Sequence, residues 1–150
     1  MNKKTQHCQQ RDKELLELYN ETVDFLLNNG VENAHQEAII WAIRFGHPHF
    51  TLGFDRAYPI VNSLLRHDKH LVTNELHQGV WNDIAEQVKA LIEISPNITV
   101  PKALEFVLDN GRASQFHLTQ LQAMRNLRKI KKENTRRLIE KMKNQRPELN

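Results

Sequence analysis

The residues with the clearest chemistry in this sequence are cations near its C-terminal end. Residues 112–150 carry 11 Lys and Arg against 3 Asp and Glu, whereas residues 1–111 carry 10 against 15. If residues 119–143 form a helix, one face of it is basic and the opposite face is apolar. Cationic groups spaced one helical turn apart can follow the phosphates of a nucleic acid. The expected phosphate-contacting side chains are Arg125, Arg128, Lys129, Lys132, Arg136 and Arg137, with Arg112 and Arg56 added from two loop regions.

This pattern predicts a nucleic-acid-binding protein that prefers duplex DNA or structured RNA. Single strands fit less well, because no aromatic side chains alternate with the cations to stack on unpaired bases. A helix-turn-helix motif is only weakly indicated, since the segment HPHFTLG is too long for its tight turn.

The apolar face of the same helix supports a second interpretation, an adaptor or homodimerising module that binds a protein partner. Its proposed interaction stripe consists of Leu127, Ile130, Leu138 and Met142. A third interpretation is that the basic helix packs against the acidic residues of its own chain. A membrane-surface helix is disfavoured, because the stretch RKIKKENTRR contains one apolar residue.

Patterns typical of enzymes and metal sites are scarce. The sequence has no Gly-rich phosphate loop, no GxSxG and no CxxC, and Cys8 lies in a polar stretch. His47 and His49 lie at one end of a predicted helix, and His67 and His70 lie at the other. Such a helix spans about 18 Å, so the four side chains cannot share one ion. We therefore expect no catalytic residue, no bound metal and no cofactor.

Helices must position the cationic side chains. Gly and Pro number five each, and Leu, Ala, Glu, Lys and Gln are abundant, which favours an all-α fold over a sandwich or barrel. Apolar periodicity and capping residues predict about six helices. The first two helices cover about 11–29 and 34–45, and the third runs through 57–65 and starts late or kinks at Pro59. The fourth covers about 74–94. The fifth begins at an N-cap, Thr99, and ends at 110, and the sixth begins at a capping box of Thr119 and Gln122 and ends at about 143.

The two halves of the chain resemble each other. A shift of 65 residues superimposes Gly46 on Gly111, and one extra loop residue then places Phe50 on Phe116. This alignment predicts an internal duplication with two similar three-helix units, residues 11–70 and 71–143, packed as one domain. Residues 1–10 are expected to be flexible, and residues 144–150 to form a C-terminal tail.

The duplication makes specific predictions about equivalent residues. Phe50 and Phe116 should both be buried, and so should Trp41 and its counterpart Phe106. The glycine at the end of each buried helix is expected to adopt the left-handed conformation that other residues avoid.

The expected setting is the cytoplasm. A single cysteine cannot form an internal disulfide, which fits a reducing compartment. The initial MNKKTQHCQQ has no apolar stretch after its lysines, and no segment has the roughly 18 to 20 apolar residues of a membrane span.

Overall fold

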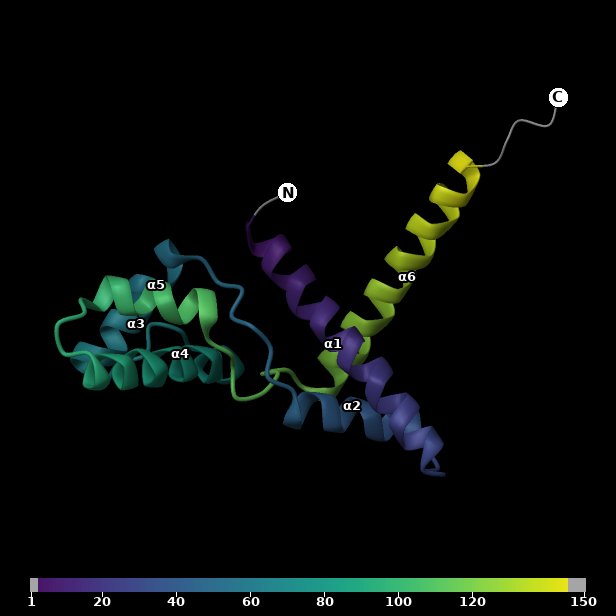
Figure 1. Ribbon diagram of the computed structural model, residues 1–150, viewed down its shortest axis with the longest axis horizontal. Coiled ribbons are helices and arrows are strands. Elements are labelled where there is room, and N and C mark those ends of the chain that lie inside the picture. Colours follow the sequence, from purple (N-terminus) through teal and green to yellow (C-terminus); the bar gives the residue numbers. More distant parts are fainter. Residues whose placement is uncertain (1–2, 146–150) are drawn as a thin grey trace.

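The computed structural model describes the backbone of residues 3–145 and the side chains of residues 8–145 (Figure 1). These residues form an all-helical protein, as the composition predicted. The helices are α1 (Lys3–Asn28), α2 (Ala34–Phe45), α3 (Phe54–His67), α4 (Glu75–Ile94), α5 (Val100–Asn110) and α6 (Gln120–Gln145). Within the described range there is no β-strand, and the β-bridge found there is an isolated antiparallel one between His49 and Arg112.

Local capping chemistry explains where two of the helices begin. At the start of α6, the Thr119 backbone N–H donates to Gln122 Oε1 at 3.0 Å, and the Gln122 N–H donates to Thr119 Oγ1 at 3.1 Å. This reciprocal pair is the predicted capping box. At the start of α5, Thr99 Oγ1 accepts from the Lys102 N–H at 3.4 Å. The predicted N-cap at Thr99 is therefore also present.

The helices pack as two lobes joined by two crossing segments (Figure 1). The first lobe consists of α1, α2 and α6, and its core includes Leu15, Tyr19 and Ala38. The second lobe consists of α3, α4 and α5, and its core includes Val61 and Ile84. Each lobe therefore takes two consecutive helices from one half of the chain and its third helix from the other half.

This grouping differs from the expected units 11–70 and 71–143. Helix α3 packs on α4 and α5 rather than on α1 and α2, and α6 occupies the corresponding place in the first lobe. An apolar helix face can be buried against any partner of suitable shape. The spacing of apolar residues therefore predicted which side of each helix is buried, but not which lobe receives it.

The two crossing segments, residues 46–53 and 111–119, hold each other in place. The Ala113 N–H donates to Pro48 O at 2.8 Å, next to the bridge between His49 and Arg112. The second segment is also attached to α2, where the Phe116 N–H donates to Ile43 O at 3.1 Å. Phe50 is buried in the second lobe and Phe116 in the first, so each aromatic ring enters the lobe that its following helix joins. The predicted burial of both phenylalanines is confirmed.

The predicted burial of Trp41 and Phe106 is wrong. Trp41 is 44% exposed and Phe106 is 56% exposed. Each lies on the outer side of a short helix whose opposite side supplies the core, through Ala38 and Ala42 in α2 and through Leu104 in α5. The apolar character of these helices extends around more of their circumference than the lobes can cover.

The expected left-handed conformation of Gly46 and Gly111 is also wrong. Gly46 has φ −79° and Gly111 has φ −80°, which are extended values open to any residue. Both glycines instead lie where an aromatic ring approaches the backbone. A Cβ on Gly46 would lie 2.5 Å from Phe116 Cε2, and a Cβ on Gly111 would lie 2.9 Å from Phe50 Cε2. Glycine is needed at these positions because an aromatic ring lies close to the backbone, and not because φ is positive.

The first helix begins earlier in the chain than predicted. Residues 1–10 were expected to be flexible, but α1 begins at Lys3 and carries the backbone of residues 3–10. Lys and Gln have high helix propensity, and extending a helix already anchored by Leu15 requires no new nucleus. At the other end, α6 continues to Gln145, and the rest of the predicted tail, residues 146–150, lies outside the described residues.

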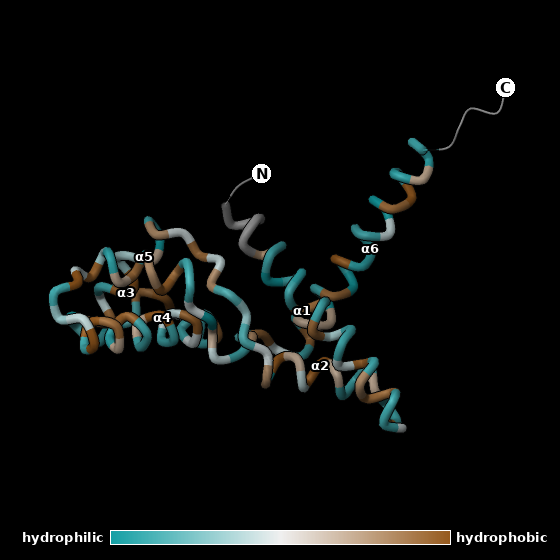
Figure 2. The backbone as a smooth tube through the Cα atoms, in the orientation of Figure 1, coloured by the Kyte–Doolittle hydropathy of each residue, from teal (hydrophilic) through white to brown (hydrophobic). Residues whose placement is uncertain are grey.

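The N-terminal part of α1 and the C-terminal part of α6 project from the first lobe as diverging arms (Figure 1). Figure 2 shows mainly hydrophilic residues along the α6 arm, with a few hydrophobic ones among them. Among the residues described, no helix combines the length and apolar character needed to cross a membrane.

Candidate nucleic-acid interface and interlobe cavity

Helix α6 divides into a packed base and an exposed arm. At the base, Ala123 and Leu127 are buried in the core of the first lobe, and Ile130 is half-buried. From Asn134 to Gln145 every residue is exposed. At 1.5 Å per residue this exposed segment is about 18 Å long. The arm therefore presents all sides of a helix to solvent.

The predicted phosphate-contacting cations of α6 are all exposed, and they lie on one helix. The ion pairs found within residues 8–145 join other groups, and none of them includes an α6 cation. The exposed cations are Arg125, Arg128, Lys129, Lys132, Arg136 and Arg137.

Two lysines at the base of α6 face side chains of α1. Burial raises the pKa of the Asp12 carboxyl above its ordinary value, and the nearby charges of Arg11 and Lys129 oppose this rise. Lys131 Nζ lies 4.5 Å from the centroid of the Tyr19 ring, a cation–π arrangement. Contact between the basic helix and α1 is thus seen at the packed base, below the exposed arm.

Arg112 and Arg56 lie at the junction of the lobes, away from the α6 arm. Arg112 belongs to a crossing segment, where its Nη1 donates to His47 O at 3.4 Å. Its own carbonyl accepts from Gln87 Nε2 at 2.7 Å. Arg56 is an exposed residue of α3 that lines a cavity between the lobes. The structure therefore does not bring these two residues onto the basic face of α6.

The proposed interaction stripe is split between core and solvent. Leu127 is 4% exposed and forms part of the first lobe's core, and Ile130 is half-buried beside it. Leu138 is 58% exposed and Met142 is 61% exposed. Ile139 between them is 48% exposed. An interaction surface on this helix is therefore restricted to its arm.

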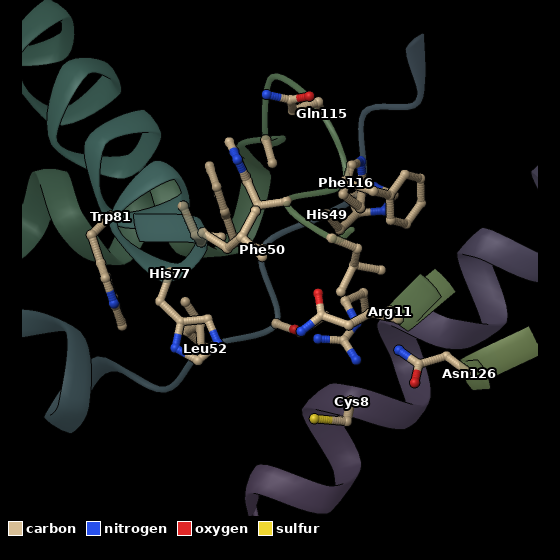
Figure 3. A pocket seen from close by; sticks show the side chains of 18 of the residues that line it. Cys8, Arg11, His49, Phe50, Leu52, His77, Trp81, Gln115, Phe116 and Asn126 are labelled. Carbon is tan, nitrogen blue, oxygen red and sulfur yellow. The ribbon is translucent and has the colours of Figure 1, made fainter. Parts of the chain in front are cut away.

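A cavity of about 540 Å³ opens where the lobes meet, and sequence reasoning missed it (Figure 3). Figure 3 shows Trp81 and His77 of α4 on one side of the cavity and Arg11 of α1 with Asn126 of α6 on the other. Both crossing segments also contribute. Because the lining residues come from four helices and two crossing segments, no local motif marks them.

Two of the three histidines that line this cavity, His49 and His117, are held by carboxylates. His49 pairs with Glu14 of α1, and His117 Nε2 lies 2.8 Å from Asp83 Oδ2 of α4. The same Asp83 oxygen accepts from the Ser114 backbone N–H at 2.8 Å and from Ser114 Oγ at 2.9 Å. Glu14 therefore fixes the crossing segment that follows α1 and α2, and Asp83 fixes the crossing segment that follows α4 and α5.

The Ser114, Asp83 and His117 cluster does not have the order of a nucleophilic triad. In a triad the histidine lies between the serine and the carboxylate, so that it can take the hydroxyl proton. Here the carboxylate oxygen lies between the other two groups, and the hydroxyl donates directly to it. Within residues 8–145, no three His, Cys, Asp or Glu side chains converge in a manner that could hold a metal ion.

Comparison of the chain with protein-family models, with curated proteins and with solved structures gives no match in any of the three.

Proposed function

We propose that this protein binds nucleic acid, with the basic face of α6 as its contact surface and no catalytic role. The observation that carries the proposal is that the cations from Arg125 to Arg137 are exposed along one helix, which continues to Gln145 with every residue from Asn134 onward exposed. The buried side chains of α6 come from its base, so the exposed arm adds none to the core of the first lobe. The proposed setting is the cytoplasm.

A duplex is the preferred class of ligand. An α-helix with its side chains is about 10–12 Å across, which matches the major groove of B-DNA at about 12 Å. The cations from Arg125 to Arg136 extend over about 17 Å of helix, enough to reach several phosphates. No aromatic residue occurs in α6, so stacking on unpaired bases has no support there.

The salt dependence of binding tests this proposal. Fluorescence anisotropy with labelled duplex DNA, duplex RNA and single strands should show duplex binding with a log–log salt slope of roughly −3.5 to −5.5, from four to six phosphate contacts. Changing Lys132 and Arg136 together to Gln should reduce the magnitude of the slope by about 2.

A matched control removes the same charge from the second lobe. Lys89 and Lys102 are exposed on α4 and α5, and changing both to Gln should leave the slope unchanged. Absence of salt-dependent binding to any of the nucleic acids at low ionic strength would refute the proposal. An equal effect of the two double variants would show that only net charge matters.

A second candidate function is association with another protein or a second copy through the α6 arm. The exposure of Leu138 and Met142 favours it, because these side chains continue the buried face of α6 beyond the lobe. Sedimentation equilibrium tests self-association. A dimer that Leu138→Asp dissociates would support this candidate, and a monomer at all concentrations would exclude the homodimer.

We also infer that the chain contains two repeats whose third helices have changed places. In support, Phe50 lies against Gly111 in the second lobe, while its counterpart Phe116 lies against Gly46 in the first. The inference predicts that α1, α2 and α6 superpose on α4, α5 and α3 in that order. A different helix order or crossing angle in the two lobes would reject it.

A further inference from the structure

We propose that the cavity between the lobes is a binding site for a small aromatic anion, a flat apolar molecule that carries one carboxylate, sulfonate or phosphate group. The six α6 cations of the proposed nucleic-acid surface do not line this cavity. The site is therefore separate from that surface, and each can be tested without the other.

The size and position of the cavity suit a small molecule. Its volume of about 540 Å³ falls within the range of about 300–1,000 Å³ that is typical of ligand pockets. It lies at the junction of the two lobes, where both crossing segments and the helices α1, α3, α4 and α6 meet. Contacts within each lobe fill the two cores, and the space between them is left open (Figure 3).

The apolar part of the lining would hold an aromatic ring system. Phe50 and Phe116, the buried aromatics of the two crossing segments, both border the cavity, and Trp81 of α4 joins them. Leu52 and Leu118, which follow the two phenylalanines, are only partly buried and also line it. Rings prefer edge-to-face or offset-stacked contacts with such side chains, which favours a flat ligand.

The charged part of the lining would hold an anion. Arg11 and Arg56 line the cavity, and no Asp or Glu does so among the described residues. Arg11 Nε and Nη2 donate to Asp12 Oδ1 at 3.3 Å and 3.2 Å, so a ligand would share the Arg11 guanidinium with Asp12. His77 adds a further nitrogen, and Gln122 and Asn126 add amide groups. Arginine binds carboxylate, sulfonate and phosphate oxygens through paired N–H donors, so a single acidic group on the ligand can be held firmly.

A ligand in this position would bridge the lobes. It would contact α1 and α6 of the first lobe and α3 and α4 of the second, together with the segments that cross between them. A ligand that binds only the folded protein raises its thermal midpoint. At a concentration a hundredfold above Kd, the expected rise is about 5 °C or more for a chain of this length.

The test uses two fluorescent probes with the same aromatic frame. The anion is 8-anilinonaphthalene-1-sulfonate, and its uncharged counterpart is N-phenyl-1-naphthylamine. The chain has two tryptophans, and Trp41 lies on the outer side of α2, so Trp41→Phe leaves Trp81 as the only tryptophan and places it in the cavity wall. We expect one sulfonate probe per chain, excited by energy transfer from Trp81.

Charge variants then assign the contacts. Arg11→Gln with Arg56→Gln should weaken binding of the sulfonate at least tenfold, the effect of losing charge-assisted hydrogen bonds, and change binding of the neutral probe less than about twofold. Arg44→Gln with Arg66→Gln removes two exposed cations elsewhere and should change neither. Lys132→Gln with Arg136→Gln should also change neither.

A cavity-filling variant provides a second line of evidence. Val80 of α4 is half-buried and lines the cavity, so Val80→Phe should exclude both probes while leaving the helical circular dichroism spectrum unchanged. Failure of the folded protein to bind the sulfonate with transfer from Trp81 would overturn the proposal. Equal sensitivity of both probes to the arginine changes, or no sensitivity of either, would overturn its anionic part.

Discussion

Phe116 lies against Gly46, a residue that precedes it by 70 positions and ends the buried helix of the first lobe. The ring occupies the space that a side chain at position 46 would need, since a Cβ there would also lie 2.6 Å from Ala42 O. The corresponding contact in the second lobe joins Phe50 to Gly111. Two glycines thus admit two aromatic rings, each carried in by the segment that crosses between the lobes.

Alanine at either glycine should therefore destabilise the protein. We expect Gly46→Ala and Gly111→Ala each to lower the free energy of unfolding by about 1–3 kcal/mol, the usual cost of overpacking. Urea unfolding followed by circular dichroism measures it.

Gly30 provides a contrast, because it has φ +69° and no atom within 4 Å of an added Cβ. There Asn, which tolerates positive φ, should be less harmful than Ala. At Gly46 the smaller Ala should be less harmful than Asn. The same order of effects at both positions would contradict the close-approach explanation.

The positions of the helices were largely predictable because their signals are local. The Thr119 and Gln122 capping box, and the spacing of Leu15, Tyr19 and Val23 along α1, need only neighbouring residues to be recognised. The exposed cations of α6 followed from the same periodicity.

The exchange of third helices and the interlobe cavity were not predictable in this way. The Phe50 ring is buried whether it enters the first lobe or the second. The spacing of apolar residues therefore does not indicate which lobe it enters. The cavity joins residues as distant in sequence as Arg11 and Asn126, whose proximity depends on that choice. Gly46 was recognisable as a special residue, but the ring that requires it comes from the other half of the chain.

Two leucines of α6 should respond very differently to the same substitution. Leu127 is 4% exposed in the first lobe's core, so Leu127→Ala should lower the free energy of unfolding by about 2–5 kcal/mol. Leu138 is 58% exposed on the arm, so Leu138→Ala should change it by less than about 0.5 kcal/mol. Thermal unfolding of dilute protein measures both. A large loss at Leu138 that grows with protein concentration would indicate burial of the arm in an oligomer.

Tyr19 should contribute to stability through its hydroxyl as well as its ring. The hydroxyl lies 2.9 Å from His35 Nδ1, which joins α1 to α2. Tyr19→Phe removes this hydrogen bond but keeps the ring beneath Lys131, so we expect a loss of about 1 kcal/mol in the free energy of unfolding. Lys131→Met removes only the cation and should cost about 0.5–1 kcal/mol. Additive effects in the double variant would confirm that the two contacts are independent.

The Asp12 carboxyl should make stability fall as pH rises above its ordinary pKa. Burial raises the pKa of Asp12 in the folded protein above the unfolded value of 3.8, so between the two values the folded state binds more protons. Stability is then lost as the proton leaves. Asp12→Asn does not titrate, so its stability relative to the wild type should improve between pH 3 and pH 7. Urea midpoints at several pH values measure this, with the exposed Asp24→Asn on the same helix as control. A relative loss over that range would contradict the expected direction.

Lys129 and Lys132 should contribute unequally to nucleic-acid binding, although both lie on the basic face of α6. The Lys129 charge is the smallest of the influences that lower the pKa of the Asp12 carboxyl, and the nearby charge of Arg11 is the largest of them. Lys132→Gln should therefore reduce the magnitude of the log–log salt slope by about 0.9, and Lys129→Gln should reduce it by less.

The double variant isolates the cause of this difference. In an Asp12→Asn background the carboxylate charge near Lys129 is removed, and Lys129→Gln should then have the same effect on the slope as Lys132→Gln. Titration of the Asp12 carboxyl by NMR gives an independent measurement, because Lys129→Gln removes a lowering influence and should raise the pKa of Asp12 further. Equal slope changes for the two lysines in the wild-type background would show that the Asp12 charge does not reduce the contribution of Lys129 to binding.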